Sequence, residues 1–198
     1  MQTPPKTLPR IALQSIAAGL LLMAFFTSMW AGVATGALGN LLVFGIFGIF
    51  ILLFIAYGIY FFIVAPKLPR IDNEADREEG KKMGMWYGII FGLEGITIPL
   101  ATFLVVHFSG QERLILPVIA LVVGLHFFPM ARVFNRTIDY YLATFTTVLA
   151  LSAIVCTVKN LLNPTLIILS LGVGVALVTT AYGLYMIREG YRMTQGVR

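Results

Sequence analysis

The sequence predicts an all-α fold, namely a polytopic integral membrane protein with six transmembrane helices in a single domain over residues 1–198. Two observations support this prediction. First, 59% of the residues are hydrophobic and only 12% are charged, which is more apolar surface than a soluble domain of this size can bury. Second, the apolar residues form six runs, each near the ~20 residues that a helix needs to cross about 30 Å of hydrocarbon. The short alternating segments of a membrane β-barrel are absent.

The six predicted helices are separated by polar links. They cover residues about 11–35, 39–65, 85–108, 114–134, 138–158 and 163–187. Only the segment 66–83 is long enough for a substantial cytoplasmic loop, and its five acidic and five basic side chains give it no net charge. Asp72 or Asn73 could cap a short helix over 74–82, with acids early and lysines late. We interpret the loop as a solvated connector, with a docking site for a cytoplasmic partner as the alternative.

The distribution of Lys and Arg predicts the orientation in the membrane. Twelve of the 14 Lys and Arg side chains fall in the termini and in alternate links, and only Arg113 and Lys159 lie on the other side. Because cytoplasmic loops are enriched in basic residues, both termini are predicted to be cytoplasmic in a plasma (inner) membrane. The formal charge of +5 is therefore expected on the cytoplasmic face, where it would meet anionic lipid head groups. It does not indicate nucleic-acid binding, since no nucleic-acid-binding motif accompanies it.

Three helices share a related stretch, which suggests an internal repeat. The second, fourth and sixth helices contain AYGIYFF, VVGLHFF and AYGLYMI. Aligning these stretches on their glycines, Gly58, Gly124 and Gly183, places Tyr60, His126 and Tyr185 at one equivalent position. The unit would be a two-helix hairpin of roughly sixty residues, present three times about an axis normal to the membrane.

Glu94 is the strongest pointer to function, because it lies in the middle of the apolar run 86–108. An ionised, unpaired acid at that depth costs at least ~3 kcal/mol, so it needs a partner, a proton or water. His126 is predicted to lie at the same depth on the next, antiparallel helix, where the two side chains could share a proton. Tyr60 and Tyr185 are further candidates for a substrate or proton pathway. The alternative is a neutral Glu94 with His126 packed as an aromatic ring.

A glycine stripe on the same helix predicts close helix packing. Small residues four apart let helix backbones approach each other, and the stripe consists of Gly84, Gly88, Gly92 and Gly95. We expect no metal and no cofactor: the only cysteine is Cys156, and the sequence contains no nucleotide-binding loop, zinc-protease motif or haem-attachment motif.

These features leave three functional hypotheses. The first is a small carrier or permease, proton-coupled through Glu94 and His126, with a small molecule or a proton as its substrate. The second is an accessory or structural subunit of a larger membrane complex, or a homo-oligomer, packed through the glycine stripe. The third is a lipid-modifying membrane enzyme with the same pair as acid and base. Architecture does not decide between them, since function depends on sites.

Overall fold

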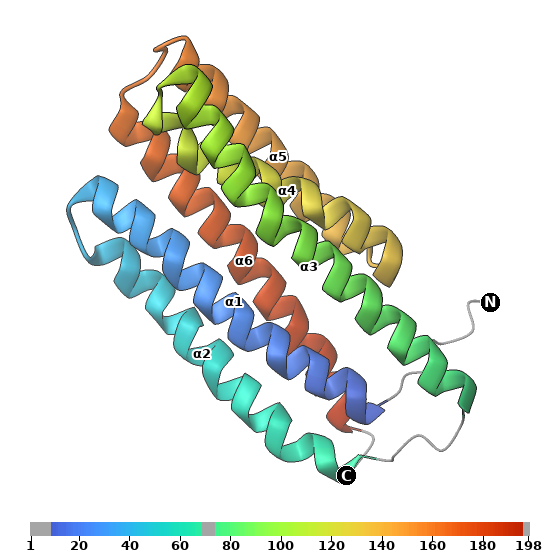
Figure 1. Cartoon of the computed structure of the whole chain (residues 1–198). Helices are drawn as coiled ribbons and strands as arrows, with labels where there is room; N and C mark the ends of the chain where they lie inside the picture. The colour runs from blue at the N-terminus through green and yellow to red at the C-terminus, as the bar shows by residue number, and fades with distance from the viewer. Residues whose placement is uncertain (1–8, 69–73, 196–198) are drawn as a thin grey trace.

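The computed structural model describes residues 9–68 and 74–195. It is an antiparallel bundle in which successive helices alternate in direction (Figure 1). All six long helices are long and apolar enough to cross a membrane. They are α1 (Pro9–Leu38), α2 (Leu42–Val64), α3 (Glu74–Ser109), α4 (Ile115–Phe134), α5 (Thr137–Val158) and α6 (Pro164–Gln195), with short 3₁₀ turns at Ala65–Lys67 (η1) and Glu112–Leu114 (η2).

Residues with left-handed backbone conformations end several of the helices. Gly39, with φ of +69°, follows α1, and the side chain of Asn40 accepts a hydrogen bond of 2.8 Å from the backbone N–H of Leu42. Asn135 ends α4 at φ +50° and Asn160 follows α5 at φ +51°. Asparagine and glycine tolerate this conformation better than other residues. The links between helices can therefore be very short.

The helix α3 is longer than the sequence predicts. It begins at Glu74 and continues to Ser109, so the short helix expected over 74–82 is the first part of α3 and not a separate element. The predicted loop 66–83 is correspondingly shorter. The acidic and basic residues of this region keep the helical repeat going, because Glu, Lys, Arg and Ala are good helix formers. Pro99 lies inside α3 and does not end it.

The helices form two groups of three. In the first group, α1 packs extensively against both α2 and α6; in the second, α4 packs against α5 and α3. The two groups meet mainly where α5 contacts α6 (Figure 1). Helix α3 packs substantially only against α4. The last hairpin therefore packs against both the first, through α1, and the middle, through α4, whereas the first and middle hairpins share no substantial contact in the described residues. The threefold hairpin repeat stays a prediction.

The contact between α2 and α6 is built from rings placed on glycines. Phe54 and Phe61 lie seven residues apart on one face of α2, and both side chains are fully buried. A Cβ atom added at Gly183 would lie 2.6 and 2.7 Å from ring carbons of Phe54, and one added at Gly190 would lie 2.6 Å from the ring of Phe61. Only glycine leaves room for these rings. Because the two phenylalanines and the two glycines have the same seven-residue spacing, the paired contacts fix the register of α2 and α6.

Candidate functional site

Glu94 is one of two residues through which α3 contacts the rest of the bundle most closely. Among the α3 side chains that the structure describes, only Ile90 and Glu94 are buried. They lie four residues apart and therefore share one face of the helix. This face meets α4. A carboxylate is thus part of the contact that holds the most exposed helix of the bundle.

The structure brings Glu94 and His126 together across the α3–α4 contact. Oε1 of Glu94 lies 3.4 Å from Nδ1 of His126, and the two side chains are only 7% and 11% exposed. This distance is longer than that of a well-formed hydrogen bond, and Nδ1 of His126 has no hydrogen-bond partner. The two groups are therefore in contact without the geometry of a hydrogen bond.

Aromatic rings enclose the imidazole of His126. Its centroid lies 5.6 Å from the ring of Phe91 and 4.4 Å from the ring of Phe127, with which it is stacked. Such walls keep the local dielectric low, so charge on either partner is costly unless the other partner compensates it. The arrangement brings together a carboxyl group and an imidazole, both of which can bind a proton.

The two tyrosines proposed for the same pathway lie elsewhere. Tyr60 is exposed on α2, in edge and tilted contacts with Tyr57 and Phe61, and α2 has no substantial contact with α3 or α4. Tyr185 is stacked on Tyr182 of α6, with ring centroids 6.3 Å apart. Sequence equivalence in the proposed repeat therefore does not place these residues beside His126.

The glycine stripe of α3 packs against no other helix of this chain. Nothing lies within 4 Å of a Cβ atom built at any of its four members, Gly84, Gly88, Gly92 and Gly95. All four are exposed. The glycines that do make close helix contacts lie on α1, α2, α4 and α6 instead. Within this chain the stripe has no packing partner, and its packing role stays a prediction.

Sequence reasoning missed a second cluster of ionisable groups, where the turn between α4 and α5 meets α6. Arg136 donates a hydrogen bond of 3.0 Å from its guanidinium to the hydroxyl of Tyr182, and it also lies over the ring of Phe134 at 5.2 Å. Burial lowers the pKa of Arg136, but the neighbouring Tyr182 and Asp139 raise it by more, so the net shift of this pKa is upward. Asp139 is fully buried. The sequence did contain a signal for this cluster, because Asp139 is an acidic residue within the helix predicted over 138–158.

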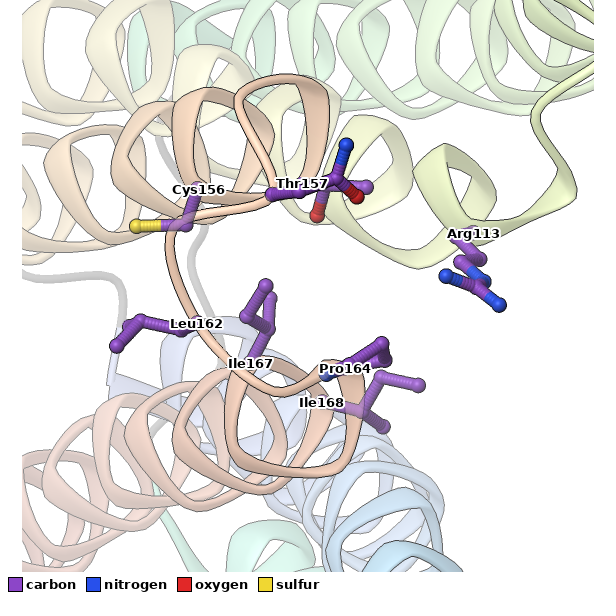
Figure 2. A pocket seen from close by; sticks show the side chains of 8 residues that line it. Arg113, Cys156, Thr157, Leu162, Pro164, Ile167 and Ile168 are labelled. Atoms are coloured by element: carbon purple, nitrogen blue, oxygen red, sulfur yellow. The ribbon is translucent and has the colours of Figure 1, made fainter.

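Two hollows lie at the opposite end of the bundle, near the turn between α5 and α6. The smaller encloses about 20 Å³, room for about one water molecule. Its lining includes Cys156, Thr157 and Ile167, with Arg113 at its edge (Figure 2). The larger, of about 380 Å³, is an open surface depression beside Glu112 and Asn160. Neither Glu94 nor His126 lines either hollow.

Across the described ranges 9–68 and 74–195, no cluster of three or more His, Cys, Asp or Glu side chains has a metal-binding arrangement. His107, near the end of α3, is stacked on Phe103 with ring centroids 5.5 Å apart. Comparison with protein-family models, with curated proteins and with solved structures finds no match to this chain.

Proposed function

We propose that the protein is an integral membrane protein of the plasma (inner) membrane, with both termini on the cytoplasmic side. The outward faces of its helices support this proposal, since large apolar side chains such as Ile49, Leu52 and Phe103 are at least 62% exposed. In water such a surface would drive aggregation, whereas lipid accepts it. The N-terminal end of α1 and the C-terminal end of α6 lie at the same end of the bundle (Figure 1). Most of the basic residues lie at this end too.

Within that membrane, we infer that the protein is a small proton-coupled carrier. One observation carries the inference: the buried contact of 3.4 Å between Glu94 and His126. An acid in the apolar part of a membrane helix marks a proton or substrate pathway more often than a packing feature. Here the acid faces a second proton-binding group on the neighbouring helix, which is the minimum requirement for passing a proton between two helices.

Proton flux into liposomes tests the carrier function. The purified protein would be reconstituted into vesicles that contain a pH-sensitive dye, and a pH gradient would be imposed. We expect Glu94→Gln and His126→Ala each to reduce the protein-dependent flux at least tenfold. The matched controls are Glu112→Gln and His107→Ala, which change exposed residues of the same types and should leave the flux unchanged. Wild-type flux in both Glu94→Gln and His126→Ala would refute the proposal.

A second candidate function, as an accessory subunit of a larger membrane complex, is favoured by the exposed glycine stripe of α3. Four glycines on a membrane helix each weaken it by up to ~1 kcal/mol relative to alanine, a cost that close contact with another helix could offset. Mild solubilisation followed by native electrophoresis distinguishes this role. An accessory subunit should migrate as part of a larger complex, and Gly88→Leu should release the chain from that complex. The matched control is Gly36→Leu on α1, where a Cβ also meets nothing; this variant should stay in the complex. Migration of the wild-type chain alone would refute the accessory role.

A further inference from the structure

A single polar side-chain contact joins the two helix groups at the end where the turn between α4 and α5 lies. Among the residues that the structure describes, the hydrogen bond from Arg136 to Tyr182 is the only well-formed side-chain hydrogen bond or ion pair between the group α1, α2, α6 and the group α3, α4, α5. The remaining contact between the groups is apolar packing of α5 and α4 on α6. Arg136 therefore supplies the polar part of a contact that is otherwise apolar at this end.

Asp139 lies beside this bond without taking part in it. Its side chain is 0% exposed, and neither carboxylate oxygen makes a well-formed hydrogen bond. Arg136 acts on it electrostatically, and the Tyr182 hydroxyl lies close enough for a weak hydrogen bond, yet Arg136 makes its own hydrogen bond to Tyr182 and forms no salt bridge with Asp139. A buried carboxylate that is ionised and unpaired is very costly, whereas a protonated one is tolerated. The observed arrangement is the one expected when Asp139 carries a proton.

We propose that Asp139 is a proton-binding site that controls the Arg136–Tyr182 hydrogen bond. With Asp139 protonated, the guanidinium reaches across to α6 and holds the two groups together. When Asp139 loses its proton to the adjoining aqueous phase, the carboxylate becomes the strongest partner within reach, because a charged acceptor binds guanidinium more tightly than a hydroxyl does. Arg136 then turns to Asp139, and α6 is released from the turn between α4 and α5.

The surroundings of Asp139 leave few other groups that could produce this response. Helix α6 presents Tyr182 and Tyr185 to it, and Arg136 precedes it in the chain. Helix α4 directs its ionisable side chains elsewhere: His126 faces Glu94 on α3, and Arg132 is exposed. Both tyrosines are neutral well beyond neutral pH. Asp139 is therefore the group whose titration would move Arg136, and the inference does not depend on the role of Glu94 and His126.

The distance between α5 and α6 as a function of pH tests the proposal. Spin labels would be attached through Thr137→Cys and Tyr191→Cys, both exposed, in a Cys156→Ser background in lipid nanodiscs. We expect one short distance at acidic pH and a second, longer distance that becomes populated as the pH rises. Asp139→Asn should keep the short distance at every pH, and Tyr182→Phe should show the longer distance even at acidic pH.

Two further variants make the test decisive. Glu189→Gln, which removes a nearby acid that pairs with Arg192 at 3.0 Å, should retain the wild-type response. If Asp139→Asn does not fold, Asp139→Glu keeps a titratable carboxyl and should retain a pH-dependent distance with an altered midpoint. A pH-independent wild-type distance, or an unchanged response in Asp139→Asn, would overturn the proposal.

Discussion

The packing of Phe54 on Gly183 gives the sharpest test of how this bundle is held together. Gly183→Ala adds one methyl group, which would lie 2.6 and 2.7 Å from two ring carbons of Phe54. An ordinary contact of that kind is near 3.5–4.0 Å, so α2 and α6 would have to separate by about 1 Å or the buried ring would have to leave its rotamer. Overpacking of this sort costs typically 1–3 kcal/mol. This cost exceeds the gain of up to ~1 kcal/mol from replacing glycine in a helix.

The assay is unfolding in mixed micelles as the fraction of denaturing detergent increases, followed by circular dichroism. We expect Gly183→Ala to lower the free energy of unfolding by about 1–2 kcal/mol. The matched control is Gly92→Ala on α3, where a Cβ meets nothing within 4 Å, so its stability should rise or stay constant. In a Phe54→Leu background, the variant with alanine at position 183 should be more stable than the one with glycine, because leucine leaves room for the added methyl group. Equal stabilities of Gly183→Ala and Gly92→Ala would contradict the packing described for α2 and α6.

Three further predictions concern other contacts. His126→Leu leaves the Glu94 carboxyl buried without a partner and should lower the free energy of unfolding by about 1–3 kcal/mol. Adding Glu94→Leu should restore most of this loss in the same detergent titration. A double variant as unstable as His126→Leu alone would count against the pair. Thr179 donates to the carbonyl of Ala176 at 3.0 Å, so it accepts the bond of 2.8 Å from Thr27; Thr27→Val should cost about 0.6 kcal/mol, and nothing once Thr179→Val is present. Finally, a cysteine at Lys159 in a Cys156→Ser background should react with a membrane-impermeant maleimide from outside intact cells, and protection of this cysteine would reverse the proposed orientation.

The sequence by itself determined the helices and the meeting of Glu94 with His126. Hydropathy is a local property, so runs of apolar residues locate the helices without knowledge of their neighbours. Helical rise is constant, so counting residues from a shared turn predicts which side chains of α3 and α4 lie at equal depth. That reasoning anticipated the pair that the structure places 3.4 Å apart. It could not give the start of α3, because charged residues that form helices well continue the helix beyond the apolar run.

Only the tertiary structure decided which helices are neighbours and which faces meet. Rotation about a helix axis and the choice of neighbour depend on side chains fitting together over many residues, and a membrane gives the helices no hydrophobic drive to choose one apolar face over another. For this reason the glycines of α3 look like a packing stripe yet meet nothing, whereas Gly183 and Gly190 receive the rings of α2. For the same reason Arg136, read from the sequence as a loop charge, is found bonded to Tyr182 beside the buried Asp139.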